Sequence, residues 1–500
     1  MITGESITKS HVDYMTLIKK VWVILLLLFF HNSALSQQKK EISGIIQYLS
    51  SPLLEGREIG THGSKIAAEY IASQFIQSGL KPIKKSNVES PSISDYFQNF
   101  NLKRYRVKDC SLSVSDTQLT HGTDFIIENA VRNITIKDRP VWVGYGINDS
   151  ATLIRSYNPI DVVGKVVIIK DGFPNISESW GKEWSIISQN KDSSYFELDN
   201  RAIRLAQEGA TLLIVIPKDY PESFVSPVKP NMVGTCNNTE LYQDAIFLKK
   251  GESHNEIPVV YLSMHGADKF YSTRHDSLLR VSFIIEQDSI QAYNVVSCLP
   301  GQDTNATVII GAHYDHLGSR SEGIYTGADD NASGIAGLLI LARHFANSGV
   351  TPEFNLVFAA WTGEEKGLLG SEHYASKLDT SKRIKLYLNM DMISRSAPED
   401  IRLNIISIGT RKIDEGLRIK ASEVNKDLND YFQLDLWEVD GYHGSDYASF
   451  TSLNIPVATF FSGFHNDYHT PCDNFQRIDI HKADQIINFI SKFLETVLLN

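Results

Sequence analysis

Four short apolar runs in the C-terminal part of the chain alternate with helical patterns, and each run leads into side chains that can bind a metal or move protons. The runs are 306–312, 355–361, 385–390 and 455–461. A helix is predicted from about 333 to 347, between the first two runs. Strands that alternate with helices are typical of βαβ units and a parallel sheet. From about residue 291 onward we therefore expect an α/β fold with a mostly parallel central sheet flanked by helices.

The reactive side chains that follow these runs are all histidines or carboxylates. In chain order they are His313, Asp315, Asp330, Glu364, Glu365, Asp391 and His469. In open parallel sheets, ligands collect at the carboxyl ends of the strands, so we expect these side chains to lie together. Histidine nitrogen and carboxylate oxygen suit Zn²⁺, and the sequence therefore predicts a zinc site at this edge of the sheet.

Two metal ions about 3.5–4 Å apart can hold a hydroxide between them and polarise a carbonyl group. Such a site needs a bridging carboxylate and a base that does not coordinate metal. The adjacent Glu364 and Glu365 can divide these tasks, one binding metal while its neighbour handles the proton. His313 and Asp315 lie two residues apart and point the same way in an extended segment, so Asp315 can orient the His313 ring.

Each motif alone also has an ordinary explanation. The pair Glu364-Glu365 fits a solvated turn, and 329–331 fits a helix N-cap with acidic groups favoured by the helix dipole. His469 fits a loop histidine. The common order of these motifs after four strands favours the metal site over all three explanations together. Five further histidines are expected to have structural roles: His316, His344, His373, His443 and His465.

At these residues the sequence resembles the co-catalytic zinc aminopeptidase family, which includes secreted bacterial leucyl aminopeptidases and, more distantly, glutamate carboxypeptidase. The matching stretches are GAHYDHLG (311–318), GADDNASG (327–334), WTGEEKGLLGS (361–371), LNMDMISR (388–395) and DYHTPCDN (467–474). The resemblance covers 291–500 and a lead-in at 49–82. It implies a zinc exopeptidase, most of all an aminopeptidase that hydrolyses N-terminal residues of peptides.

The resemblance also implies roles for single residues. It implies two Zn²⁺ ions per chain, held by His313, Asp330, Glu365, Asp391 and His469. Asp330 is then the bridging carboxylate, and Glu364 is the general base that takes a proton from the bridging water. Asp315 is the acid beside the His313 ligand, and Tyr468 holds substrate or the oxyanion.

The chain departs from the family pattern at two positions. It has Ser445-Asp446-Tyr447 where many relatives read Ser-Asp-His, and Asn454 where they often have Gly. Neither position carries a metal ligand. Other functions on the same scaffold remain open: a carboxypeptidase or dipeptidase, a glutaminyl cyclase with one zinc ion, or a non-catalytic binding protein.

The segment 108–290 has a different pattern. Its strand-like runs are 141–143, 166–169, 212–216 and 259–262, with one clear helix near 201–208 and no cluster of His, Asp and Glu. This segment is similar to a protease-associated domain, a mixed and mainly β module that is inserted into the peptidase domain in this family. The resemblance implies a role in substrate access, with the peptidase domain formed by 37–107 and 291–500.

Residues 1–36 have the pattern of a signal peptide. Two lysines precede the apolar run 21–30, which is too short to span a bilayer, and Ala34 and Ser36 precede a predicted cut near Gln37. We expect an exported protein, periplasmic or secreted, without stable membrane insertion after cleavage. The formal net charge of -11 argues against nucleic-acid or anionic-membrane partners. Peptide substrates are the predicted partners.

The four cysteines, Cys110, Cys236, Cys298 and Cys472, match no zinc-finger spacing. In an oxidising compartment they can form up to two disulfides, with three possible full pairings. Buried free thiols are the alternative, and the sequence leaves both open.

Overall fold

The computed structural model describes most of the chain. The described residues are 37–83, 91–149, 154–155, 157, 159–172, 198–217, 246–249, 257–271, 278–320, 322–379, 381–440 and 444–498. The predicted signal peptide and His443 lie outside them. Within these ranges no helix is long and apolar enough to cross a membrane.

The chain forms two compact units. The first comprises the described residues of 37–99 and 293–498, and the second those of 100–292, whereas the insert predicted from sequence is 108–290. Both changes from one unit to the other fall within long strands, β2 (Phe97–Val114) and β13 (Leu279–Leu299).

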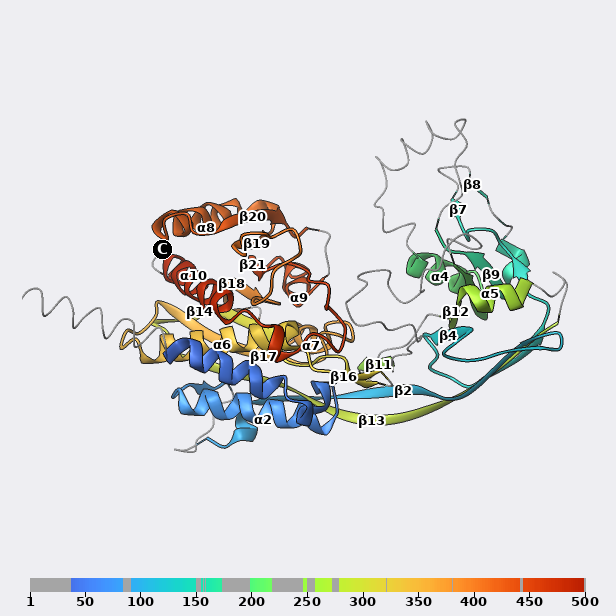
Figure 1. Ribbon diagram of the computed structural model, residues 1–500, viewed down its shortest axis with the longest axis horizontal. Coiled ribbons are helices and arrows are strands. Elements are labelled where there is room, and N and C mark those ends of the chain that lie inside the picture. The colour runs from blue at the N-terminus through green and yellow to red at the C-terminus, as the bar shows by residue number, and fades with distance from the viewer. Residues whose placement is uncertain are drawn as a thin grey trace, which may run out of the picture. The chain divides into compact units, whose positions relative to one another are not determined.

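The first unit is built on a mixed sheet with the strand order β13-β17-β14-β18-β21-β19-β20 (Figure 1). Apart from β13, the strands in this order are β14 (Asp303–His313), β17 (Phe354–Trp361), β18 (Arg383–Met390), β19 (Ile405–Thr410), β20 (Gln433–Glu438) and β21 (Val457–Phe461). The short strand β1 (Lys81–Pro82) pairs with β13. The four central strands, β17, β14, β18 and β21, are parallel, while β13 and β19 pair antiparallel with their neighbours β17 and β21. The predicted α/β fold with a mostly parallel central sheet is confirmed.

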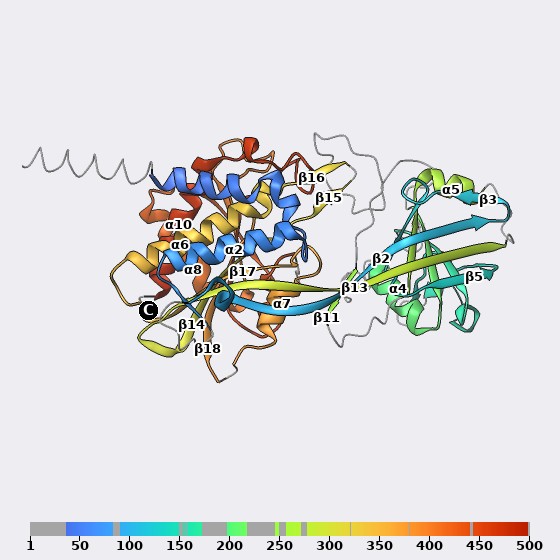
Figure 2. The ribbon, with the colours of Figure 1, turned by 90° about the horizontal axis from the view of Figure 1, so that it is seen from below.

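Helices cover both faces of this sheet. They are a helix over 37–49, α2 (His62–Gln77), α6 (Gly334–Asn347), α7 (Leu369–Ala375), α8 (Glu415–Asp427), α9 (Tyr447–Thr451) and α10 (Ile480–Leu498). On one face α6 packs against β14, β17 and β18 and lies beside α2 and α10 (Figure 2). α7 and α9 contact each other, and their residues Ala375, Tyr447 and Phe450 belong to the apolar core of the other face.

The two cores follow from the alternation of side chains along the strands. In β14, Val308 and Ile310 belong to the large core beneath α6, whereas Ile309 points into the core beneath α7 and α9. Successive side chains of a strand point to opposite faces, so a run that is apolar at every position must be buried on both. This explains why the strands that lead into the reactive residues appear in the sequence as continuous apolar runs.

Short helical turns and one β-hairpin connect these elements. The helical turns are the 3-10 turns Pro52–Arg57, Ile93–Tyr96, Lys412–Asp414 and Phe475–Arg477 and the π-helical turn Ala328–Ser333. The hairpin consists of β15 (Gly318–Arg320) and β16 (Gly323–Tyr325). The π-helical turn leads directly into α6.

The second unit has a sheet of its own with the strand order β4-β12-β10-β9-β6. These strands are β4 (Phe125–Glu128), β6 (Val141–Trp142), β9 (Val166–Lys170), β10 (Leu212–Ile216) and β12 (Val259–Leu262). Shorter elements are β3 (Thr117–Leu119), β5 (Ile134–Asp138), β7 (Asn148–Asp149), β8 (Ile154–Arg155), β11 (Ile246–Lys249) and the 3-10 turn Pro159–Val162.

The described residues of this unit include two helices, α4 (Leu198–Gln207) and α5 (Met264–Tyr271). The one clear helix predicted near 201–208 corresponds to α4. The helix α5 gave no clear signal because it is only eight residues long and closely follows a buried strand. Among the described residues of this unit no group of His, Cys, Asp and Glu is arranged to hold a metal ion.

Three of the four cysteines lie within the described residues, and Cys236 lies outside them. Cys110 and Cys298 are free, and Cys472 is disulfide-bonded. Burial raises the pKa of both free thiols to about 11, so they are neutral and unreactive at physiological pH.

Candidate metal centre

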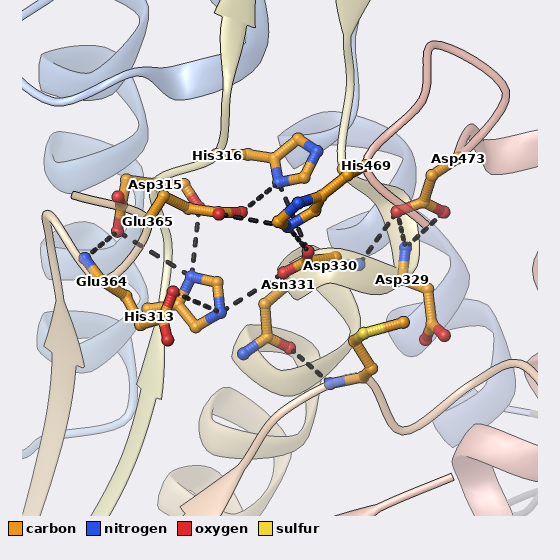
Figure 3. A network of polar contacts seen from close by, with 12 residues as sticks. His313, Asp315, His316, Asp329, Asp330, Asn331, Glu364, Glu365, His469 and Asp473 are labelled. Carbon is orange, nitrogen blue, oxygen red and sulfur yellow. Dashed lines mark hydrogen bonds and ion pairs between the residues drawn. The ribbon is translucent and has the colours of Figure 1, made fainter. Parts of the chain in front are cut away.

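The ends of the four parallel strands bring the reactive residues together. β14 ends at His313, and Glu364 and Glu365 come three and four residues after the last residue of β17. Asp391 directly follows β18, and the segment after β21 supplies His469. Because these strands are parallel neighbours, their carboxyl ends share one edge of the sheet, and the side chains converge there (Figure 3).

Two groups of side chains are arranged to hold a metal ion. The first is His313, Glu364 and Asp391, whose candidate ligand atoms all lie within 4.8 Å of one another. His313 Nε2 lies 3.2 Å from Asp391 Oδ1 and 4.0 Å from Glu364 Oε2. The imidazole is buried, with 1% of its side chain exposed.

The second group is His316, Asp330 and Glu365. His316 Nδ1 lies 2.7 Å from Glu365 Oε1. His469 reaches the same carboxylates from the segment after β21, with its Nε2 3.1 Å from Asp330 Oδ2 and 3.2 Å from Glu365 Oε2. Four protein groups therefore surround this second position.

Asp330 lies between the two groups. Its Oδ1 is 3.4 Å from His313 Nε2 and its Oδ2 is 3.1 Å from His469 Nε2, so each carboxylate oxygen faces a different histidine. The main chain of Asp330 is fixed in turn, because its N–H donates to Asp473 Oδ2 at 3.0 Å. A carboxylate placed in this way can serve as the bridge that a two-metal site requires.

Polar groups behind these side chains hold them in place. Asn331, which follows Asp330 through a cis peptide bond, donates to Met390 O and accepts from the N–H groups of Gly334 and Met392. In this way one amide ties the start of α6 to the end of β18.

The other oxygen of Asp391 also has a partner. Ser445 Oγ donates to Asp391 Oδ2 at 2.6 Å, which leaves Oδ1 to face His313. Such outer hydrogen bonds orient metal ligands and fix which oxygen they present. Ser445 belongs to the stretch that departs from the family pattern, but its hydroxyl still reaches the site.

Carboxyl groups outnumber histidines among the side chains of this site. Burial raises the pKa of Asp330 to about 8, and repulsion from Glu365 adds to it. Burial opposes the charged form of His469, but Glu365 and Asp330 outweigh it and raise the pKa of this ring to about 10. Carboxylates brought together in this way at the ends of strands are characteristic of a cation site.

Glu364 differs from its neighbour in its electrostatics. Burial raises the pKa of Glu364 well above its ordinary value, and the charges of Glu365 and Asp391 add to the shift. Burial also acts on Glu365, but the rings of His469 and His316 lower its pKa well below the ordinary value. These pKa shifts suit Glu365 to binding a metal ion as an anion, and they suit Glu364 to accepting a proton.

Asp315 lies in the site but not as expected. His313 Nδ1 faces the main-chain oxygen of Asp315 at 3.2 Å. The carboxylate oxygen Oδ1 of Asp315 lies 3.8 Å from His313 Nδ1, which is beyond hydrogen-bond range. The carboxylate accepts instead from the N–H of Glu364 at 3.2 Å. Burial raises the pKa of Asp315 to about 6. Asp315 thus links the two strand-end loops through the backbone of Glu364.

Tyr468 stacks on the ring of His469, with 3.8 Å between ring centroids and 21° between the planes. His316, for which we expected a structural role, lies in the second metal group and contacts Glu365. A signal was present in the sequence: His316 follows His313 by three residues, directly after the same strand. Ser445 and Asp473, which hydrogen-bond to Asp391 and to the main chain of Asp330, directly follow no predicted strand and carried no such signal.

Of the other histidines, His344, His373 and His465 belong to neither metal group. His465 Nε2 lies 3.4 Å from Asp329 Oδ2, so this ring supports the acidic turn that precedes Asp330. His344 is half exposed on α6 and faces Glu495 on α10.

Comparison with known proteins agrees with this geometry. A model of peptidase family M28 matches residues 294–494, which hold every residue of both groups. This part of the chain is similar to peptidase family M28. The M28 match ends four residues before the last residue of α10 and begins within β13.

Curated relatives are similar to the same region. The chain is 29% identical over 215 residues to leupeptin-inactivating enzyme 1 of Streptomyces exfoliatus, covering 39% of this chain and 45% of that protein. It is also 29% identical over 214 residues to a probable leucine aminopeptidase 2 of Aspergillus oryzae, covering 41% of each. The chain thus spans less than half the length of these relatives, and their similarity to it concerns the M28 domain.

Among solved structures, the fold resembles that of an aminopeptidase from Aneurinibacillus sp. strain AM-1. The match has a TM-score of 0.61 and 22% sequence identity, and it covers 92% of this chain and 93% of the other. At this identity the likeness concerns the fold, and it extends over both units of the chain.

Proposed function

We propose that this protein is an exported zinc aminopeptidase that removes N-terminal residues from peptides. The observation that carries the proposal is the position of Asp330, whose two carboxylate oxygens face two separate groups of metal-binding side chains. The names of the M28 relatives support cleavage at the amino end of the substrate over the carboxypeptidase and cyclase alternatives.

The donor set fits zinc. His313 and Asp391 would hold one ion, Glu365 and His469 the other, and Asp330 would bridge them. Nitrogen and carboxylate oxygen donors are those of hydrolytic zinc sites. Two zinc ions held there would supply a Lewis acid for the scissile carbonyl and lower the pKa of a shared water.

Glu364 supplies the base. It is adjacent to a ligand, lies 4.0 Å from His313 Nε2, and has its pKa raised by burial. It would accept a proton from the attacking water at a carboxylate oxygen and return it to the leaving amine. The amine of a free N-terminus could hydrogen-bond to the carboxylates beside the metal ions, which would give exopeptidase selectivity.

Two further parts of the proposal rest on the sequence. We propose that the second unit is a protease-associated domain, supported by its separate five-stranded sheet. We propose export from the pattern of residues 1–36. Edman sequencing of protein recovered from the periplasm or medium should give an N-terminus near Gln37, and full-length protein retained in the cytoplasm would contradict export.

The proposal is tested by release of free amino acids from a panel of peptides with free and N-acetylated ends, with and without a zinc chelator. Glu364→Gln keeps the size of the side chain but removes the base. Glu353→Gln, at an exposed position just before β17, is the matched control. Zinc content is measured on each protein.

We expect chelator-sensitive release from free N-termini only. Loss of the general base should reduce kcat by about 10²–10⁴-fold in Glu364→Gln with zinc still bound, while Glu353→Gln behaves as wild type. Equal cleavage of N-acetylated peptides would refute the aminopeptidase proposal. A zinc-bound protein that releases nothing would point to carboxy-terminal cleavage, cyclisation or binding instead.

A further inference from the structure

His316 is buried in the site without belonging to the predicted ligand set. Its ring is fully buried directly after β14, with Nδ1 2.7 Å from Glu365 Oε1 and 3.7 Å from Asp330 Oδ2. Its position alone allows two roles. His316 either donates a metal-binding nitrogen or holds the ligand Glu365 in place.

The distance to Glu365 favours the second role. His316 Nδ1 lies 2.7 Å from Glu365 Oε1, the length of a short hydrogen bond, whereas the Nε2 atoms of the predicted ligands His313 and His469 lie 3.1–3.2 Å from the carboxylates beside them. A ring nitrogen that carries a proton has no lone pair for a metal ion. His316 Nδ1 can therefore bind Glu365 or a metal, but not both at once.

The oxygens of Glu365 are divided between two histidines. Oε1 faces His316, whereas Oε2 lies 3.2 Å from Nε2 of His469. With Oε1 occupied by a hydrogen bond, Glu365 presents a single oxygen on the side where Asp330 and His469 converge. This division parallels Asp391, whose Oδ2 accepts from Ser445 while Oδ1 faces His313.

The His316 ring is held firmly by its surroundings. Gly327 has a φ of 52° and packs so closely that a Cβ there would lie 2.5 Å from His316 Cγ. The guanidinium of Arg57 donates to Gly327 O at 2.9 Å and to Tyr314 O at 2.6 Å. One buried arginine thus fixes the backbone on both sides of the imidazole.

We propose that His316 is a positioning residue that holds Glu365 as a one-oxygen ligand of the second metal ion. The inference rests on the proposed two-metal site. By keeping one oxygen of Glu365 away from the metal, His316 leaves a coordination position free for water or substrate, which a catalytic zinc site needs. Without it, Glu365 is free to turn both oxygens toward the metal or to move out of the site.

The test compares two substitutions. Asn carries its amide nitrogen three bonds from Cα, as His carries Nδ1, so His316→Asn keeps the hydrogen-bond donor and cannot replace a zinc-binding imidazole. His316→Ala removes both functions. His344→Ala, at the half-exposed histidine of α6, is the matched control. The two zinc dissociation constants are measured by competition with a chromophoric chelator, alongside the cobalt(II) absorption spectrum and the Tm of each protein.

A positioning role predicts that His316→Ala weakens one zinc site by about 10–100-fold and leaves the other unchanged. His316→Asn should restore that site to within about 3-fold of wild type, with an unaltered cobalt spectrum. Equal losses in both variants, with a changed cobalt spectrum, would make His316 a ligand and overturn the proposal. Unchanged zinc binding in His316→Ala would overturn it in favour of simple packing.

The metal readout separates this proposal from the proposed function. If wild type binds two zinc ions but releases no amino acid, the aminopeptidase proposal fails, and the comparison of His316→Asn with His316→Ala still decides the role of His316. A wild-type protein that binds fewer than two zinc ions would overturn both.

Discussion

Replacing Arg57 by methionine should destabilise the first unit strongly. The side chain is fully buried, and its guanidinium donates to the main-chain carbonyls of Leu49, Tyr314, Thr326 and Gly327. Burial lowers the pKa of Arg57 to about 10, which still leaves it charged at neutral pH. A methionine can fill most of the space but satisfies none of the four carbonyls.

The size of the effect follows from those four acceptors. A buried acceptor that loses its donor costs about 1–3 kcal/mol. Removing the guanidinium also removes the cost of burying its charge, so we take about 3–6 kcal/mol as the net loss in the free energy of unfolding. At about 2–4 °C for each kcal/mol in a unit of this size, Tm should fall by roughly 6–24 °C.

Differential scanning calorimetry measures this directly. Arg343→Met is the matched control, because Arg343 is partly exposed and pairs with Glu41 at 2.7 Å, an interaction worth about 1 kcal/mol or less. Arg57→Lys, with three donors in place of five, should lie between Arg57→Met and wild type. Equal shifts for Arg57→Met and Arg343→Met would refute the reasoning, because the carbonyls would then have found other partners.

Three further predictions concern the site. Asp330→Ala removes the bridge and should lower zinc content, measured after gel filtration, from two ions per chain to one or fewer; two retained ions would show that the metals do not share this carboxylate. Gly327→Ala places a Cβ 2.0 Å from Asp330 O at a positive φ, so its Tm should fall by several degrees, and an unchanged Tm would mean that this turn can shift freely. Burial raises the pKa of Asp446 from 3.8 to about 7, so the folded state holds a proton that the unfolded state has lost. We therefore compare the free energy of unfolding in urea of the zinc-stripped wild type with that of Asp446→Asn. The difference, wild type minus variant, should fall as pH rises from about 4 to about 7 and then level off. A difference that stays constant with pH would contradict this.

The sequence predicted the elements that determine the site. Runs such as 306–312 and 355–361 are apolar at nearly every position because their strands are buried on both faces, and this is the pattern that sequence reveals most clearly. Because these strands are parallel neighbours, the residues after them had to meet at one edge. His313, Glu364 and Asp391 can therefore be grouped from the order of strands and reactive residues along the chain.

Other elements left weaker signals. β20 is an edge strand with an irregular mixture of exposed and half-buried side chains, so its residues 433–438 show no clean alternation. The π-helical turn over 328–333 has no periodic pattern at all. In both places tertiary contacts, rather than local preferences, determine the structure.

The contacts that orient the ligands were also beyond reach of the sequence. Asp473 accepts hydrogen bonds from the N–H groups of Asp329 and Asp330, yet it lies more than one hundred residues away along the chain. Nothing in the residue type distinguishes it from other acidic loop residues. His316 was underestimated for a related reason: a histidine beside a ligand looks the same in a sequence whether it binds metal, orients a carboxylate or fills space.

The central place of β14 in the sheet of the first unit has a consequence for how the protein matures. β14 lies between β17 and β18, and the donors come from segments spread between residues 313 and 469. In a zinc finger, ligands close together in the chain let the metal nucleate folding, whereas here the binding groups converge only after distant parallel strands have paired. Metal ions would therefore bind last, to a chain that has already completed its sheet. Metal binding would then require correct assembly, and the proposed activity would be confined to correctly folded chains.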